Sequence, residues 1–246
     1  MQVSQSVSRA YQLNKIFWMA ADWIFPPHCG GCQQPGTRWC DVCNQSVDVV
    51  DWSTHCKICA APVLHPGVCT TCHSNPMPMS AILSWGVYQG PLREGIHSMK
   101  YQNNLGIAQD LSLPLISIIN NENWQIDCIT AVPLSYQRQK QRGYNQSIVL
   151  ARWIAWGLGL HFMPDLLSRT RDTRSQIGLS AIERHRNVED AFSTSSYNVN
   201  HKVVLIIDDV TTTGATLINC GKALANAGAK EVFGLTLAKA VHLDMI

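Results

Sequence analysis

The sequence has few charged residues, no long apolar run and no low-complexity segment. No stretch reaches the ~18 to 20 apolar residues that a membrane-spanning helix needs. Charged residues make up 15% of the 246 residues and apolar residues 46%, which argues against a disordered chain. The length suits one large domain, or a medium domain joined to a small one. We therefore expect a globular protein without a transmembrane helix.

The N-terminal segment lacks a convincing secretory signal. Residues 16–25 are partly apolar, but Asp22 interrupts them and no clear small-residue cleavage site follows. We therefore expect a cytoplasmic protein. Residues 1–23 are expected to form a short amphipathic helix, which Pro26 and Pro27 separate from the next segment.

Eight of the ten cysteines form four Cys-x-x-Cys pairs between residues 29 and 72. Each pair supplies two thiolates, so two pairs complete a tetrahedral Cys₄ zinc site and four pairs complete two sites. A disulfide framework would require an oxidising compartment. The sequence therefore predicts a double zinc ribbon over residues 24–78. Its two structural zinc ions would be held by Cys29, Cys32, Cys40, Cys43, Cys56, Cys59, Cys69 and Cys72.

Two pairings of these knuckles are open. Sequential pairing joins the first pair with the second and the third with the fourth, whereas a cross-braced arrangement joins the first with the third. The break at residues 45–54 separates two similar units and favours sequential pairing. Trp39 and Trp52 either pack the small zinc core or offer stacking surfaces for bases. Cys128 and Cys220 lie in apolar surroundings and are expected in the core.

Residues 79–246 are expected to form an α/β domain, after a linker with prolines at positions 76 and 78. Strands are predicted at residues 82–88, 126–134, 166–170, 203–207 and 232–237. Helices are predicted at residues 92–101, 107–119, 146–156 and 217–227. Because strands and helices alternate, we expect a parallel sheet with helices on both faces.

The most informative segment spans residues 203–216. Five apolar residues predict a buried parallel strand. Asp208 and Asp209 follow at its carboxyl end, where open α/β sheets bind ligands. A short turn follows and leads into a helix. The turn consists of Thr211, Thr212, Thr213, Gly214, Ala215 and Thr216.

Each residue type in this segment suits a ribose phosphate. Backbone N–H groups at a helix N-terminus and threonine hydroxyls donate to a phosphate, and Gly214 lets the backbone approach it. Paired carboxylates accept hydrogen bonds from two neighbouring hydroxyls. The sequence has no Gly-Lys-Ser/Thr, which argues against a nucleoside-triphosphate P-loop. The alternative is a threonine-rich helix cap with solvated aspartates.

Positive charge is concentrated between residues 136 and 186. This segment holds nine Lys or Arg and three Asp or Glu, a balance of +6, which leaves −4 for the rest. The strand that ends in Val132, Pro133 and Leu134 runs into three cations, and a second basic loop follows at residues 169–180. Such loops bind anionic groups, contact a nucleic-acid backbone, or are simply solvated. The cations concerned are Arg138, Lys140, Arg142, Arg169, Arg171, Arg174 and Arg184.

Residues 203–216 resemble the phosphoribosyl pyrophosphate (PRPP) signature of type I phosphoribosyltransferases. The resemblance implies that Asp208 and Asp209 hold the ribose 2′ and 3′ hydroxyls as the catalytic pair, and that residues 211–216 wrap the 5′-phosphate. It also implies a type I phosphoribosyltransferase fold and a Mg²⁺ ion bound with PRPP. Pyrophosphate would bind Val132, Pro133 and Leu134, with Arg138, Arg142 and Arg169 as supporting cations.

The whole pattern resembles the ComF family of competence and DNA-utilisation proteins, from about residue 24 onward. Besides the cysteine pairs and the PRPP signature, the matching segments are residues 97–101 (HSMKY), residues 132–134 (VPL) with Arg138, and residues 142–146 (RGYNQ). Arg169 with Gln176, Leu179, Arg184 and Asn187 also matches. Tyr144 stands where the family often has phenylalanine. The resemblance implies a role in taking up or using DNA, with PRPP, single-stranded DNA and competence or DNA-processing proteins as partners.

Three functions are compatible with these residues. The first is a DNA-uptake protein that binds PRPP and contacts single-stranded DNA through Arg138, Lys140, Arg142, Arg171, Arg174 and Arg184. The second is an active phosphoribosyltransferase, but no residues define its acceptor. The third is a non-catalytic PRPP sensor with a partner-binding zinc module. In each case the zinc sites are structural, because all four ligand positions are filled.

Overall fold

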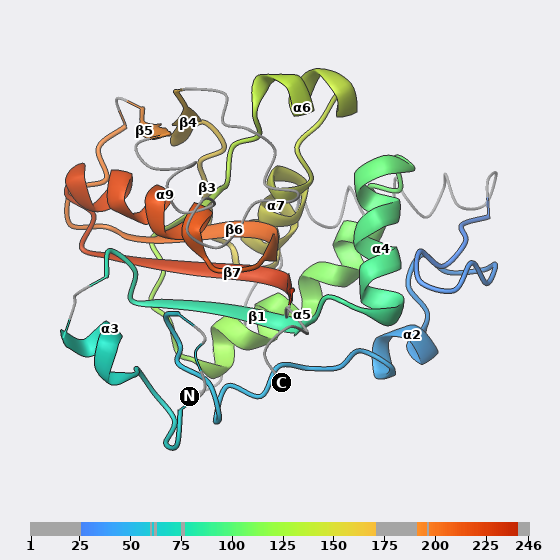
Figure 1. Cartoon of the computed structure of the whole chain (residues 1–246). Helices are drawn as coiled ribbons and strands as arrows, with labels where there is room; N and C mark the ends of the chain where they lie inside the picture. The colour runs from blue at the N-terminus through green and yellow to red at the C-terminus, as the bar shows by residue number, and fades with distance from the viewer. Residues whose placement is uncertain are drawn as a thin grey trace.

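The computed structural model describes residues 26–59, 61, 63–74, 77–170, 191–195 and 197–240 (Figure 1). The helix predicted at residues 1–23 lies outside this part of the chain, and so do Arg171, Arg174 and Arg184. Among the helices of the described residues, none is long and apolar enough to cross a bilayer.

A five-stranded parallel sheet forms the centre of the molecule, with its strands in the order β1-β7-β6-β2-β3. Its central strands are buried on both faces, as their apolar runs predict. In β6, Val203, Leu205 and Ile207 contribute to one core, and Val204 and Ile206 contribute to the other. The strands are β1 (Ala81–Val87), β2 (Cys128–Ala131), β3 (His161–Phe162), β6 (Val203–Thr211) and β7 (Glu231–Lys239).

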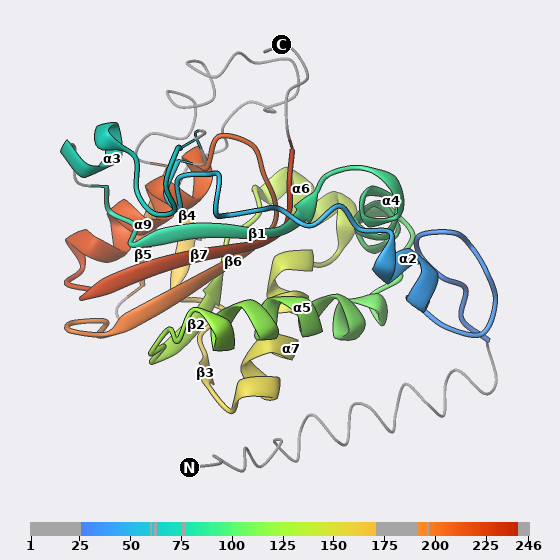
Figure 2. The same ribbon diagram turned by 90° about the horizontal axis from the view of Figure 1, so that it is seen from below.

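Helices cover both faces of this sheet (Figures 1 and 2). The helices α4 (Gly90–Tyr101), α5 (Ile107–Asn121) and α7 (Gln146–Leu158) pack in the first core. The helix α9 (Ala215–Asn226) packs in the second, together with the antiparallel pair β4 (Leu167–Arg169) and β5 (Phe192–Thr194). The α/β fold with a parallel sheet and two covered faces is confirmed. Cys128 and Cys220 are buried in the second core, as expected.

The structure differs from the prediction at residues 126–134 and at residues 136–142. The strand expected at residues 126–134 is shorter, because β2 ends at Ala131 and Pro133 cannot donate to a strand ladder. Residues 136–142, which were not predicted as a helix, form α6 (Tyr136–Arg142). This helix has no buried residue and therefore no apolar periodicity to reveal it. Ser135 caps its N-terminus, and Gly143 ends it in the left-handed conformation.

The cysteine-rich segment lies against the sheet domain and includes the short helices α2 (Asp41–Gln45) and α3 (Thr70–Ser74). Its residues 47–52 run along the outer edge of β1 (Figure 2), where Val50 N donates to Trp85 O at 3.0 Å. Trp52 Nε1 donates to Ser84 O at 3.0 Å, and Trp39 is buried in the first core. Both tryptophans therefore pack against the sheet domain, and the segment covers a strand edge that would otherwise be open.

Candidate functional site

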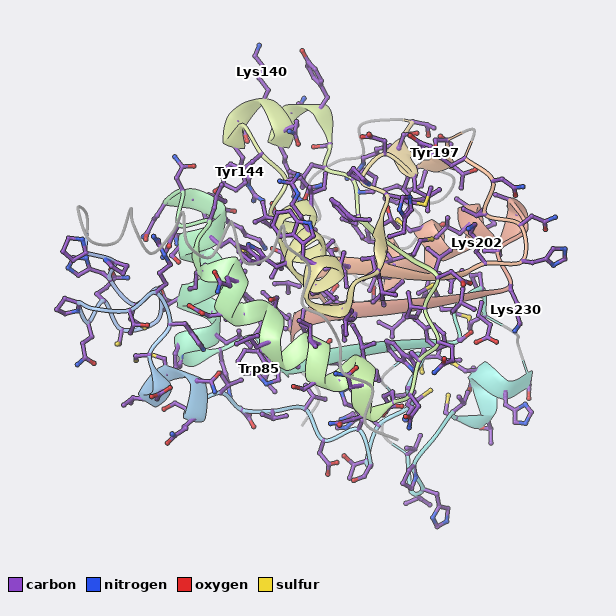
Figure 3. All side chains as sticks on the ribbon, turned by 180° about the vertical axis from the view of Figure 1, so that it is seen from behind. Trp85, Lys140, Tyr144, Tyr197, Lys202 and Lys230 are labelled. Atoms are coloured by element: carbon purple, nitrogen blue, oxygen red, sulfur yellow. The ribbon has the colours of Figure 1, made fainter. Side chains whose placement is uncertain are left out.

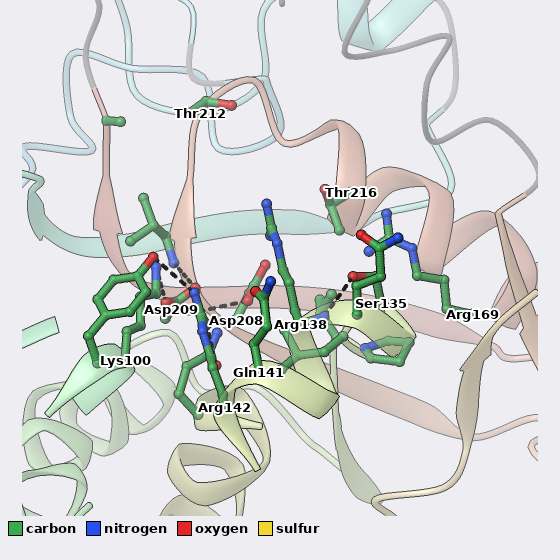
Figure 4. A pocket seen from close by; sticks show the side chains of 18 of the residues that line it. Lys100, Ser135, Arg138, Gln141, Arg142, Arg169, Asp208, Asp209, Thr212 and Thr216 are labelled. Carbon is green, nitrogen blue, oxygen red and sulfur yellow. Dashed lines mark hydrogen bonds and ion pairs between the residues drawn. The ribbon is translucent and has the colours of Figure 1, made fainter. Parts of the chain in front are cut away.

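A pocket of about 830 Å³ opens at the carboxyl edge of the sheet (Figure 4). Because all five strands are parallel, the loops that follow β1, β2, β6 and β7 meet at this edge. The C-terminal end of α4 and the helix α6 complete the walls. The lining of the pocket includes Lys100, Val132, Pro133, Leu134, Arg138, Arg142, Arg169, Asp208, Asp209, Thr212 and Thr216.

The predicted acid pair lies side by side at the end of β6. Asp208 Oδ1 accepts hydrogen bonds from Ser147 Oγ at 2.8 Å and from Asp209 N at 2.9 Å. Burial raises the pKa of Asp208 to about 6, although the bond from Ser147 and the nearby cations oppose this. Asp209 is buried, and its Oδ1 accepts from Val210 N at 2.9 Å. The two carboxylates are thus held in fixed orientations.

Lys100 forms an ion pair with Asp209 Oδ2. This lysine comes from α4, and its side chain is only 16% exposed. Burial lowers its pKa to about 8; the charge of Asp208 opposes this, and Arg142 and Arg138 add to it. Lys100 belongs to the segment 97–101 that resembles the ComF family, but no role for it was predicted from the sequence. Sequence alone does not show that this helix end lies against β6.

The threonine-rich turn joins β6 to α9, and its residues lie on two different surfaces. Gly214 is the N-cap of α9 with φ of 76°, a conformation that favours glycine, and a Cβ there would lie 3.3 Å from Ile82 Cδ1. Thr213 Oγ1 accepts from Ala215 N at 3.4 Å. Thr212 and Thr216 line the pocket, whereas Thr211, Thr213 and Gly214 line a small cleft against the zinc module. Ala215 is buried in the second core.

Three of the predicted cations line the pocket (Figure 4): Arg138 and Arg142 from α6, and Arg169 from β4. Arg142 donates to Gln146 Oε1 at 2.9 Å and to Tyr101 Oη at 3.1 Å. Lys140 is exposed and projects from the far side of α6 (Figure 3).

The turn after β2 forms the wall beside these cations. Asn145 Nδ2 donates to Val132 O at 2.9 Å, and Asn145 Oδ1 accepts from Ser147 N at 2.9 Å at the start of α7. One asparagine therefore ties residues 132–134 to the helix that presents Ser147 to Asp208.

The cysteines form two separate clusters, and the structure pairs the knuckles sequentially. Cys29, Cys32, Cys40 and Cys43 make one cluster, and Cys56, Cys59, Cys69 and Cys72 make the other. In each cluster the ligand atoms lie within 4.8 Å of one another. The cross-braced alternative is excluded. Four thiolates at this spacing suit a structural zinc ion.

Backbone N–H groups stabilise the thiolate form of one cysteine in each cluster. Burial tends to raise the pKa of Cys29, but bonds from the N–H groups of Cys40, Cys32 and Gly31 lower it to about 6. In the second cluster Cys69 N donates to Cys56 Sγ at 3.2 Å, and the pKa of Cys56 is also lowered to about 6 against the effect of burial. A thiolate is the form that binds metal.

Two family descriptions match this chain: a double zinc ribbon domain over residues 20–73 and a phosphoribosyl transferase domain over residues 145–242. The DNA utilization protein YhgH of Escherichia coli (strain K12) is 32% identical over 217 residues, which cover 84% of this chain and 94% of the relative. Competence protein F of Haemophilus influenzae is 29% identical over 221 residues, covering 87% of this chain and 96% of the relative.

Similarity to solved structures is weaker. The allosteric regulatory enzyme of purine biosynthesis aligns with 54% of this chain at 24% identity and a TM-score of 0.37. The aligned region spans about a quarter of that enzyme, 26% of its chain.

Proposed function

Because this chain belongs to the ComF family of DNA-utilization and competence proteins, which join a double zinc ribbon to a phosphoribosyltransferase domain, we propose that its pocket binds PRPP. The observation that carries this proposal is the acid pair at the carboxyl end of β6, followed at once by the turn into α9. The pocket volume of about 830 Å³ is within the usual range for small-molecule sites.

The lining residues suggest how PRPP would lie. Asp208 and Asp209 would accept hydrogen bonds from the ribose hydroxyls. Thr212, Thr216 and the N-terminal N–H groups of α9 would bind the 5′-phosphate. Arg138, Arg142 and Arg169 would face the diphosphate from the opposite wall.

Mg²⁺ fits this arrangement through Asp208. Its carboxylate lines the pocket and supplies oxygen ligands, which Mg²⁺ prefers together with substrate phosphates. The ion, when bound, would neutralise charge on the diphosphate. Asp209 is less suited to direct coordination because its buried carboxylate is already paired with Lys100.

We also propose that the protein serves DNA uptake or utilisation and contacts single-stranded DNA along α6. This helix carries Arg138 and Arg142 on the face that lines the pocket, and Lys140 on the opposite face, one turn from Tyr136, whose side chain is 74% exposed. Cations with an exposed aromatic ring suit single strands, which bind through phosphate contacts and base stacking. Arg171, Arg174 and Arg184 remain predictions for the same surface, outside the described residues.

Calorimetric titration of PRPP with Mg²⁺ into the zinc-loaded protein tests the first proposal. We expect binding by the wild type and its loss in the Asp208→Asn, Asp209→Asn variant, which can no longer accept from the ribose as an anion. Asp165→Asn is the matched control, because Asp165 is an exposed acid outside the pocket lining. Equal binding by all three proteins would refute the assignment.

A further inference from the structure

The ion pair between Lys100 and Asp209 is not explained by ribose binding. A ribose hydroxyl needs an acceptor, and Asp209 has its Oδ2 engaged by an ammonium group. Burying a lysine ammonium group costs desolvation free energy, which only interactions with opposite charges offset. The side chain of Lys100 lines the same pocket as the acid pair, so a ligand in the pocket can contact it.

Two segments that the fold brings together hold Lys100 in place. Tyr144 Oη donates to Met99 O at 2.5 Å, one residue before Lys100. One residue after it, Tyr101 Oη accepts from Arg142 at 3.1 Å, and the guanidinium carbon lies 4.8 Å from the centre of the Tyr101 ring. The segments 97–101 and 142–146 therefore form one unit that fixes the end of α4.

The charges around Lys100 are arranged for an anion. Asp208 favours the charged form of Lys100 and Asp209 pairs with it, but Arg142 and Arg138 both disfavour that charge. Two arginines near a buried ammonium oppose its charge, and an anionic ligand lying among them would relieve this repulsion. An ammonium group has three donors, and one carboxylate oxygen does not exhaust them.

We propose that Lys100 binds the diphosphate of PRPP while it orients Asp209 toward the ribose. This inference rests on the proposed function and adds a residue to it. Lys100 lies beside the acids of β6 and lines the same pocket as the arginines of α6, so its ammonium group is placed to contact both the ribose side and the diphosphate side of a bound ligand. The ion pair with Asp209 fixes the position of the Lys100 ammonium group before the ligand binds.

Inorganic pyrophosphate is the probe that separates this role from mere neutralisation of Asp209, because it has no ribose. Calorimetry would compare the wild type, Lys100→Met, Asp209→Asn and the double variant. Loss of one charge-assisted contact predicts pyrophosphate binding weaker by about tenfold or more in Lys100→Met. The same loss of pyrophosphate affinity is expected when Lys100→Met is added to Asp209→Asn. In that background residue 209 carries no charge, so removing Lys100 leaves no unpaired carboxylate that could disturb the fold.

The pH profile gives a second readout. The charged and titratable groups facing Lys100 are Asp208 and Asp209 of β6, Arg138 and Arg142 of α6, Tyr101 of α4 and Tyr88 after β1. The ammonium binds an anion and the neutral amine does not, so wild-type affinity should fall as pH rises through about 8. Lys100→Arg should bind pyrophosphate without this fall, since a guanidinium stays charged. The arginine variant also corrects for titration of the ligand itself.

The outcomes are distinct. If Lys100→Met leaves pyrophosphate binding unchanged in the Asp209→Asn background, Lys100 only neutralises Asp209 and the inference is wrong. If in addition PRPP binding still depends on Asp208 and Asp209, the proposed function stands without it. If the wild type binds neither PRPP nor pyrophosphate, both fail together.

Discussion

At the scale of single residues, the site holds the carboxylate of Asp208 at a cost to stability. The pKa of Asp208 is about 6 in the folded protein, against an ordinary value of 3.8, mainly because of burial. An acid whose pKa is raised by folding stabilises the fold below the unfolded value, and this contribution is lost as pH rises through the folded value. The contribution of Asp208 to the free energy of unfolding is therefore lost between pH 3.8 and about 6.

This cost predicts a pH-dependent effect of Asp208→Asn. At pH 7.5 the variant should be more stable than the wild type by roughly 1 kcal/mol, a figure reduced because Asp208 is partly exposed. At pH 5 the wild-type carboxyl is mostly neutral, so the difference should shrink. Urea unfolding of the zinc-loaded proteins at both pH values measures it. The same difference at both values would contradict the account.

Gly214 supports a second prediction at this scale. Gly214→Ala should cost about 1 to 2 kcal/mol of stability, because φ is 76° there, and should also weaken ribose 5-phosphate binding by displacing the turn from Ile82. Gly159→Ala is the matched control, since Gly159 has φ of 67° with open space around it at the far end of α7. It should lose similar stability and keep full ligand affinity. Equal ligand affinity in both variants would refute the role of the turn.

Residue types in local order were enough to propose the acid pair and the threonines as candidate site residues. Asp208, Asp209 and the threonines follow one another, so their chemistry is readable from one stretch of sequence. Lys100 lies more than a hundred residues before Asp209. Its role depends on where α4 ends relative to β6, which only tertiary packing decides.

At the scale of elements, α6 is the structural basis of the proposed DNA contact. Arg138→Ala with Arg142→Ala should weaken single-stranded DNA binding and reduce its salt dependence, by ~0.7 in the slope for each lost phosphate contact. Lys202→Ala with Lys230→Ala is the control, because these exposed lysines lie at the amino ends of β6 and β7, away from α6 (Figure 3). Fluorescence anisotropy across a salt series provides the slopes. Unchanged slopes in the arginine variant would remove α6 from the DNA contact.

The two zinc clusters support different parts of the pocket. Trp52, Ile58 and Cys59 line the cleft behind residues 211–214, whereas Trp39 packs against Gly95 of α4. Cys59→Ser should therefore weaken ribose 5-phosphate binding several-fold with little effect on pyrophosphate. Cys32→Ser, in the first cluster, should show the opposite preference. Calorimetry with zinc analysis of each variant tests this, and identical ligand profiles would contradict it.

Elements were predictable where they carry an apolar pattern. The sequence predicted β6 and β7 from their continuous apolar runs, and α4 and α7 because their buried faces repeat with the period of a helix. The helix α6 has no such face. Its signals were Ser135 before the first turn and Gly143 after the last, which are cap residues rather than core residues. The strand β3 has only two residues, too few for any periodicity.

At the scale of the whole molecule, parallel topology explains why distant segments share one site. Every strand of the sheet presents its carboxyl end at the same edge, so residues from α4, the β2 turn, α6 and the β6 turn meet there. Alternation of strands and helices predicted the parallel sheet, but the order β1-β7-β6-β2-β3 did not follow from it.

The zinc module and the sheet domain are packed together more closely than their sequence boundary suggests. Cys29, Trp39, Cys43 and Val47 belong to the same core as α4, α5 and α7. The boundary near residue 78 stays a prediction. Its position was read from prolines, which mark the end of a segment but reveal nothing about packing across it.

The most direct test of the central claim is a crystal structure of the zinc-loaded protein with PRPP and Mg²⁺. We predict density in the pocket at the carboxyl edge of the sheet, with the 5′-phosphate at Thr212 and Thr216, the ribose at Asp208 and Asp209, and the diphosphate beside Lys100 and Arg138. Density for PRPP at another place, or an empty pocket at a saturating ligand concentration, would contradict the account.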